Sequence, residues 1–334
     1  MKQPLSKTKR RVRRVCVILI VTVLSYVIAS MAGSVIVFHI VFARSSTVNA
    51  FELRYCDIDQ SKYPREEIYF ASGKNKLFGA VYRPRGEPKA LVVAVNGMNC
   101  CIDRHLPEIC YFVDSGFTVM TFENTGVGKS EGADSVGIAQ ARLDLNAAIR
   151  YTRGDASLKK LPLLLYGHSL GGYAVAASLR DCRDIRAAVC VSGFDSPNRN
   201  MYVSAKRRVG VLADVQYPFM CLQNYFLFGG KGDDSAVSAI NAVDTPVLIA
   251  GGSSDDVVTA DISILGRAKD ITNPNAVFLE VDEPYRCEHS TVWLSRESAE
   301  YLAETARPTD RQRANRLDED FMRQIVAFYQ KSIG

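Results

Sequence analysis

A serine between two glycines is the segment of this sequence whose chemistry is easiest to interpret. Residues 167–171 have the order Gly-His-Ser-Leu-Gly, with Ser169 at the centre. The apolar residues 163–166 precede them and the small and apolar residues 172–177 follow, which predicts a strand, a sharp turn and a helix. Glycines let backbone segments approach closely at such a strained turn, and the turn exposes the serine hydroxyl. The pattern therefore predicts that Ser169 is a nucleophile.

A serine hydroxyl needs a base to remove its proton, and histidine usually has that role. The sequence contains four histidines. His39 lies in a long apolar segment, His105 precedes Ser169, and His168 is expected to face away from the serine. Where this motif occurs, the acid and then the histidine follow the serine along the chain. His289, on a loop after the last predicted strand, is therefore the expected base.

The elements that must position these residues alternate along the chain. Segment 67–83 predicts a β-hairpin that turns at 73–75. Short apolar runs predict buried strands, and helical spacing predicts helices between them and over 310–332. The strands are expected at 90–95, 117–122, 161–166, 187–191, 246–250 and 276–281, and the helices at 137–151, 171–179 and 261–269. This alternation predicts an α/β fold with a mostly parallel central sheet flanked by helices.

Segment 196–244 interrupts the alternation, because it is long and rich in aromatic residues. We expect it to form a small helical lid over the carboxyl edge of the sheet. Its aromatic side chains either line a substrate pocket or pack the lid onto the core, and both interpretations stay open. They are Tyr202, Tyr217, Phe219, Tyr225, Phe226 and Phe228.

The acid that orients the histidine is expected on the loop after strand 246–250. This loop contains Asp255 and Asp256, either of which could also cap a helix. The sequence resembles the α/β-hydrolase superfamily, which includes serine esterases, lipases and serine aminopeptidases. In that superfamily the loop commonly has the pattern G-x-x-D-x-x-V, which aligns with Gly252, Asp255 and Val258. The resemblance therefore implies Asp255 rather than Asp256.

The oxyanion that develops during acyl transfer needs two backbone N–H donors. One is expected at Leu170, which follows the serine. The other is expected after strand 90–95, where Asn96 and Gly97 stand in place of the His-Gly of many relatives. Met98 is the expected second donor, with the neighbouring Asn99 as the alternative.

A second glycine-rich turn extends the resemblance, which covers residues 67–334. Segment 123–132 corresponds to the family pattern D-x-R-G-x-G-x-S-x-G, but Thr125 replaces the arginine. Its Gly-Lys-Ser sequence is not a phosphate-binding loop, because Glu123 occupies the position of the first required glycine.

An apolar segment near the N-terminus predicts a transmembrane anchor. Residues 15–43 contain no Asp, Glu, Lys or Arg, and roughly 20 apolar residues suffice to cross a bilayer. A cleaved signal peptide is the alternative, although its apolar region is usually shorter. Basic residues precede the segment, which predicts a cytoplasmic N-terminus and a body on the exoplasmic or periplasmic side. They are Lys2, Lys7, Lys9, Arg10, Arg11, Arg13 and Arg14.

The expected organisation is a basic cytoplasmic tail (1–14), the anchor (15–43), a juxtamembrane link (44–66) and a hydrolase domain (67–334). The net charge of +5 is concentrated in the tail, so composition gives no support for a nucleic-acid-binding body. Eight cysteines outside the anchor permit disulfides in an oxidising compartment, and no C-x-x-C pair suggests zinc or thiol redox chemistry.

Together these features predict a membrane-anchored serine hydrolase that acts on a carboxylic ester or thioester of a small lipid-like or acyl substrate. The reaction needs no metal or organic cofactor. A membrane-anchored serine peptidase and a catalytically silent binding module are the alternatives.

Overall fold

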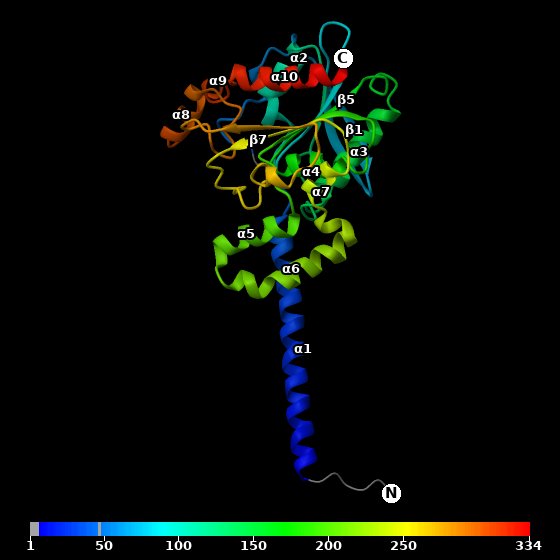
Figure 1. Cartoon of the computed structure of the whole chain (residues 1–334), viewed down its shortest axis with the longest axis vertical. Coiled ribbons are helices and arrows are strands. Elements are labelled where there is room, and N and C mark those ends of the chain that lie inside the picture. Colours follow the sequence, from blue (N-terminus) through cyan, green and yellow to red (C-terminus); the bar gives the residue numbers. More distant parts are fainter. Residues whose placement is uncertain (1–6, 46–47) are drawn as a thin grey trace.

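The computed structural model describes residues 7–45 and 48–334. The first six residues of the expected basic tail, including Lys2, and residues 46–47 of the expected link lie outside this range. A long helix, α1 (Lys7–Val41), projects from an α/β body, as Figure 1 shows. The helix begins within the expected tail, so the basic residues from Lys7 onward are helical.

An eight-stranded sheet forms the centre of the body, in the order β1-β2-β4-β3-β5-β6-β7-β8. Strand β2 is antiparallel to both of its neighbours, and the pairs from β4 to β8 are parallel. The predicted α/β fold with a mostly parallel sheet is thereby confirmed. The strands are β1 (Arg65–Ser72), β2 (Asn75–Tyr82), β3 (Leu91–Val95), β4 (Thr118–Phe122), β5 (Leu163–His168), β6 (Ile185–Val191), β7 (Val247–Gly252) and β8 (Ala276–Val281).

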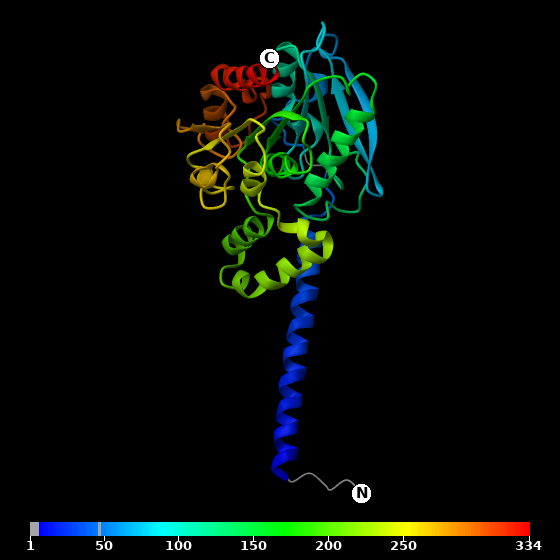
Figure 2. The same cartoon turned by 45° about the vertical axis from the view of Figure 1, so that its right-hand side comes forward.

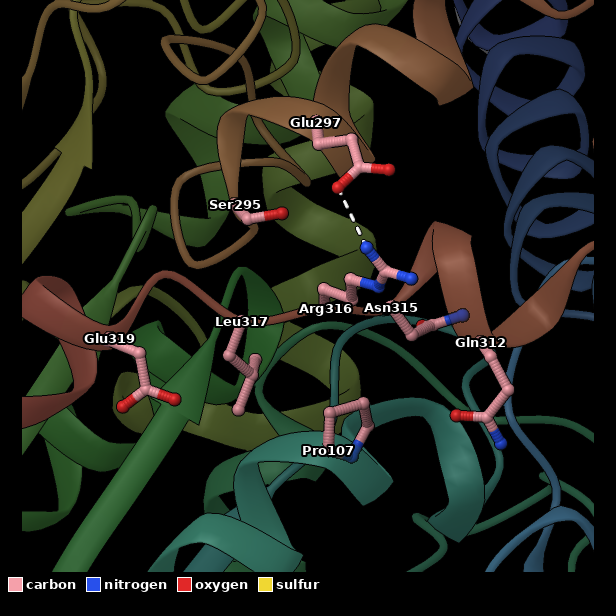
Figure 3. Close-up of a pocket in the computed structure, with 8 residues that line it drawn as sticks. All are labelled: Pro107, Ser295, Glu297, Gln312, Asn315, Arg316, Leu317 and Glu319. Atoms are coloured by element: carbon pink, nitrogen blue, oxygen red, sulfur yellow. Dashed lines mark hydrogen bonds and ion pairs between the residues drawn. The ribbon is translucent and has the colours of Figure 1, made fainter.

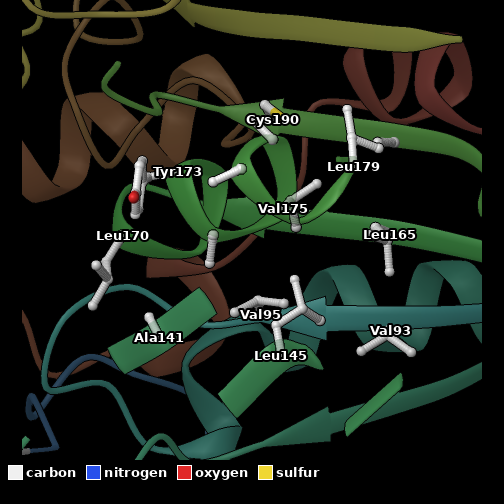
Figure 4. Close-up of a cluster of buried hydrophobic side chains, with 14 of the residues drawn as sticks. Val93, Val95, Ala141, Leu145, Leu165, Leu170, Tyr173, Val175, Leu179 and Cys190 are labelled. Atoms are coloured by element: carbon white, nitrogen blue, oxygen red, sulfur yellow. The ribbon is translucent and has the colours of Figure 1, made fainter. Parts of the chain in front are cut away.

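Helices cover both faces of the sheet because its central strands are apolar on both sides. In β3, Val93 and Val95 point toward one face, whereas Val92 and Ala94 point toward the other. The first face packs against α3 (Gln140–Gly154), α4 (Leu170–Ser178) and α7 (Ala236–Asn241), and Figure 4 shows part of this cluster. The second face packs against α2 (Leu106–Asp114), α8 (Arg296–Glu304) and α10 (Glu319–Ile333).

Two predicted helices differ from the observed elements. The helix expected over 261–269 is reduced to a 3-10 helix, η4 (Leu265–Asp270), because the backbone at Ser263 forms a bridge with Phe194 instead. The helix expected over 310–332 is divided into α9 (Arg311–Ala314) and α10. Between them the backbone of Arg316 and Asp318 bonds to residues 293–295, which prevents a continuous helix.

Segment 196–244 contains helices α5 (Pro197–Val209) and α6 (Leu212–Phe228), the 3-10 helix η3 (Gly229–Asp233) and α7. The first two form a hairpin that lies across the body end of α1 in both views (Figures 1 and 2). Most of α1 therefore projects beyond the hairpin, away from the body.

Candidate active site

Ser169 lies at the turn between β5 and α4, where its backbone has φ +56° and ψ −116°. A positive φ is unfavourable for a residue with a side chain, so the surrounding structure must enforce it. The flanking glycines are sterically required. A Cβ added at Gly167 would lie 2.3 Å from the carbonyl oxygen of Gly171, and one added at Gly171 would lie 2.1 Å from that of Val95. The segment is therefore a strained elbow that presents the serine side chain above the sheet.

His289 brings the serine and Asp255 into one hydrogen-bonded chain. Its Nε2 lies 2.9 Å from Ser169 Oγ, and its Nδ1 lies 2.7 Å from Asp255 Oδ2. When Nδ1–H donates to the carboxylate, Nε2 is free to accept the serine proton. The side chains of His289 and Asp255 are 11% and 6% exposed, so water weakens this pairing little.

The carboxylate of Asp255 is itself held in place. Its Oδ1 accepts hydrogen bonds from the backbone N–H groups of Val257 and Val258, at 2.9 and 2.7 Å. Asp256, by contrast, is exposed, and its carbonyl oxygen accepts a bond from Arg207. The structure thus places Asp255, and not the neighbouring aspartate, against the histidine.

The loops that carry Asp255 and His289 contact each other directly. A Cβ at Gly252 would lie 2.0 Å from the carbonyl oxygen of Cys287, which shows how closely the two backbones approach. The N–H of Ser254 donates to the same carbonyl oxygen at 3.0 Å. This contact fixes the distance between acid and base.

His168 has a role that sequence reasoning missed. Its side chain is buried, and its Nε2–H donates to the carbonyl oxygen of His289 at 2.9 Å. Burial lowers the pKa of His168 well below its usual value, and the neighbouring His289 and His105 lower it further. Its ring also packs edge-on against Trp293. A neutral, buried histidine therefore holds the backbone of the base, and no spacing in the sequence indicates this contact.

The expected oxyanion residues lie beside the elbow. A Cβ at Gly97 would lie 3.6 Å from the Cβ of Ser169, and Met98, Asn99 and Leu170 line one small cavity of about 10 Å³. The preceding Asn96 is buried, and its side-chain amide donates to the carbonyl oxygen of Phe122 at 3.0 Å. This hydrogen bond fixes the start of the loop that carries Met98 and Asn99.

The glycine-rich turn over 123–132 has a structural explanation. Thr125, which replaces the arginine of the family pattern, donates from its backbone N–H and its hydroxyl to Asp144, at 2.7 and 3.0 Å. Burial raises the pKa of Asp144. Gly128 has φ +51°, and a Cβ there would lie 2.3 Å from Glu123. These contacts fold the turn against α3.

A polar cavity of about 530 Å³ lies elsewhere, between α2 and the segment from α8 to α10. Glu297 and Arg316 form an ion pair of 2.8 Å at its edge, as Figure 3 shows. None of the expected site residues lines it. Within residues 7–45 and 48–334, no cluster of three or more His, Cys, Asp or Glu side chains could hold a metal ion. All nine cysteines belong to these described ranges and are unpaired there.

Several known proteins are similar to parts of this chain. Residues 86–222 match the family model described as serine aminopeptidase, S33. The uncharacterized protein YfhR of Salmonella typhi is 28% identical over 181 residues, which are 51% of this chain and 55% of the relative. The uncharacterized protein Rv2307c of Mycobacterium tuberculosis is 30% identical over 149 residues, 44% of this chain and 46% of the relative. The chain spans about half the length of the curated relatives it matches.

Solved structures share the fold. An esterase of Pyrococcus furiosus, Pf2001, superposes with a TM-score of 0.62 at 15% identity, over 88% of this chain and 99% of the esterase. An acylaminoacyl peptidase of Pyrococcus horikoshii gives a TM-score of 0.56 at 14% identity, over 80% of this chain and 41% of the peptidase. Acetyl xylan esterase 1 of Thermoanaerobacterium gives 0.52 at 15% identity, over 71% and 82%. At such identities the likeness establishes the fold, which enzymes with different substrates share.

Proposed function

We propose that this chain, which belongs to the α/β-hydrolase superfamily, is a membrane-anchored serine hydrolase that cleaves a carboxylic ester or thioester. The observation that carries the proposal is the chain of contacts from Ser169 through His289 to Asp255, at 2.9 and 2.7 Å. It combines a nucleophile, a base and an orienting acid at one edge of the sheet.

Each residue then has a defined step. His289 takes the proton of Ser169 as its Oγ attacks the substrate carbonyl, and Asp255 stabilises the imidazolium that forms. The backbone N–H groups of Met98 and Leu170 donate to the oxyanion. The imidazolium gives its proton to the leaving alcohol or thiol, which leaves an acyl group on the serine. Water attacks this acyl-enzyme, with His289 again as base, and releases the acid.

Helix α1 supports membrane attachment. It has 35 residues, and its apolar side chains are almost all exposed. A helix with apolar side chains exposed on all sides requires an apolar environment. The basic residues before residue 15 support a cytoplasmic N-terminus and a body on the opposite side.

The experiment that tests the activity is labelling of the membrane fraction with a fluorophosphonate probe, which reacts with activated serines. Wild type should be labelled, whereas Ser169→Ala and His289→Ala should not. A folded wild-type protein that resists labelling would point to a binding module instead.

A serine peptidase is the second candidate, because the matching family model is described as serine aminopeptidase and one structural neighbour is an acylaminoacyl peptidase. Parallel assays with acyl esters and with aminoacyl and blocked peptide substrates separate the two. Faster cleavage of the peptides than of the esters would favour the peptidase.

A further inference from the structure

Helix α1 is built into the body rather than joined to it by a free linker. Phe38 and Phe42 near its end are 5% and 3% exposed and belong to the hydrophobic core. After the helix, Arg44 donates to the carbonyl oxygens of Gly132 and Gly128 at 2.8 and 2.7 Å. The position of the membrane segment relative to the active site is therefore fixed.

The same helix packs against the α5–α6 hairpin. Ser34 Oγ donates to the carbonyl oxygen of Phe219 in α6 at 3.3 Å, and the rings of Tyr26 and Phe219 meet edge-on at 5.7 Å. Figures 1 and 2 show the hairpin across α1 from two directions. These contacts place α6 beside residues that belong to the apolar part of α1.

A cavity of about 380 Å³ lies between α1, α5 and α6. Pockets that bind small ligands usually measure roughly 300–1,000 Å³, so this cavity is within the range of a ligand site. Apolar side chains dominate its lining, and Arg208 is the charged residue among them. Its wall includes Gly33, Val37 and Phe38 of α1, Ala205 of α5, Met220 of α6, and Met98.

Met98 connects this cavity to the elbow. The residue before it, Gly97, approaches Ser169 so closely that a Cβ there would lie 3.6 Å from the serine Cβ. Met98 also lines the small cavity beside Leu170. An apolar chain in the larger cavity would therefore contact Met98, which follows the glycine that lies beside the nucleophile.

The length of α1 relates the cavity to the membrane that this helix is proposed to span. Twenty helical residues span about 30 Å, the thickness of a bilayer's apolar core. Counted from Val15, the first residue after the basic cluster, this length ends at Ser34, a cavity residue. His39, a little further on, pairs with Asp134 of the body at 2.8 Å. By this count, the apolar core of a bilayer spanned by α1 would end where the cavity begins.

Helix α6 has an exposed apolar face at the same level. Its charged residue is Asp214, and the exposed positions recur at helical spacing. Val211 and Phe226 at the ends of this face are 72% and 68% exposed. Exposed apolar side chains along one face of a helix are typical of contact with lipid. The face consists of Val211, Val215, Pro218, Leu222 and Phe226.

We propose that α1 and the α5–α6 hairpin together bind the acyl chain of a membrane lipid, which enters from the bilayer and presents its ester carbonyl to Ser169. This inference rests on the proposed function. It makes the membrane helix a wall of the substrate site, and it names a bilayer-resident acyl ester or thioester as the substrate class.

Gly33 offers a direct test, because a Cβ at this position meets nothing within 4 Å and a larger side chain would extend into the cavity. Gly33→Leu in full-length protein in phosphatidylcholine vesicles should lower kcat/KM for p-nitrophenyl palmitate about tenfold or more. Hydrolysis of p-nitrophenyl acetate should fall by a much smaller factor, because its two-carbon acyl group occupies little of the cavity. The matched control is Ala32→Leu, on the exposed side of the same helix, which should leave both esters unaffected.

Equal effects of Gly33→Leu on both esters, or none on either, would overturn the acyl-chain site while leaving the hydrolase intact. A second measurement does not depend on catalysis. In a Ser169→Ala background, a phosphatidylcholine with a diazirine on its palmitoyl chain should crosslink to α1, α5 or α6. Gly33→Leu should reduce this crosslinking and Ala32→Leu should not. A wild-type protein that shows neither fluorophosphonate labelling nor ester hydrolysis would instead refute the proposed function. Lipid crosslinking that is still reduced by Gly33→Leu would in that case support the acyl-chain site without the activity.

Discussion

The carboxyl edge of the sheet and the region around α1 meet at Met98, yet they are built in opposite ways. At the edge, a Cβ on Gly171 would lie 2.1 Å from a backbone oxygen, whereas a Cβ on Gly33 in α1 would meet nothing within 4 Å. The first region holds its side chains by backbone contacts that leave no space. The second leaves a cavity and exposed apolar side chains. Under the proposed function, the first region holds the catalytic residues in place. The second region could then change in shape, and so accept another substrate, without disturbing those residues.

The largest effect on activity is expected at Asp255, the proposed acid, which lies in the rigid region. Asp255→Asn keeps the shape of the side chain but removes the charge that stabilises the imidazolium. We expect kcat to fall about 10⁴-fold. Asp256→Asn is the matched control, since this neighbour is exposed and should change kcat less than about twofold. Steady-state hydrolysis of p-nitrophenyl acetate measures both, and a larger loss in Asp256→Asn would reverse the assignment of the acid.

The close packing of the elbow can be broken by one methyl group. In Gly171→Ala the new Cβ would collide with the carbonyl oxygen of Val95, so we expect a loss of stability of about 3 kcal/mol or more. Gly154→Ala at the end of α3 is the control, because its Cβ meets nothing within 4 Å and alanine favours helix by up to about 1 kcal/mol. Thermal unfolding in detergent compares the two. A Gly171→Ala protein as stable as wild type would mean that the elbow can relax.

The contrast between these regions also explains what the sequence could predict. The fold class followed from apolar runs of strand length, because strands buried on both faces leave few polar residues. The elbow was visible because its backbone contacts admit only glycine at 167 and 171. Such local constraints act within a few residues, so they leave a pattern in the sequence.

Long-range contacts leave no such pattern. The contact of His168 with the carbonyl oxygen of His289 joins residues 121 positions apart and uses a backbone acceptor that any residue could supply. The packing of α1 against α6 depends on the shape of two apolar surfaces. Helical spacing over 261–269 was misleading because the apolar residues Ile262 and Ile264 are buried in an irregular segment. Tertiary packing decided these cases.

An intermediate effect is expected on the α6 face. Phe226→Glu would place a carboxylate at the proposed membrane surface, at a cost on the order of 1–3 kcal/mol. We expect hydrolysis of p-nitrophenyl palmitate in vesicles to fall about tenfold, with hydrolysis of the acetate ester unchanged. Phe278→Glu on β8, which is also exposed, should affect neither. Equal losses in both variants would mean that the α6 face does not contact lipid.

The smallest effect concerns the pH dependence of stability. The pKa of His168 is lowered in the folded protein. Below the ordinary histidine pKa of about 6.5, this side chain therefore binds a proton more readily in the unfolded chain than in the folded protein. Folding stability linked to this group is therefore complete above that pH. It falls as pH decreases toward the folded pKa, by up to about 1.4 kcal/mol per pH unit. Glutamine at this position can still donate to the carbonyl oxygen of His289 but does not titrate.

Unfolding of wild type and His168→Gln in detergent at pH 7.5 and 5.5 isolates this effect, since the two proteins share every other titrating group. Wild type should lose more stability than the variant over this interval, by about 1 kcal/mol. We also expect His168→Gln to hydrolyse p-nitrophenyl acetate, because the glutamine side-chain amide can donate a hydrogen bond to the carbonyl oxygen of His289. An equal loss of stability in both proteins would mean that His168 accepts a proton without unfolding. In that case the backbone of the base would be held by the contact between Ser254 and Cys287 rather than by a neutral histidine.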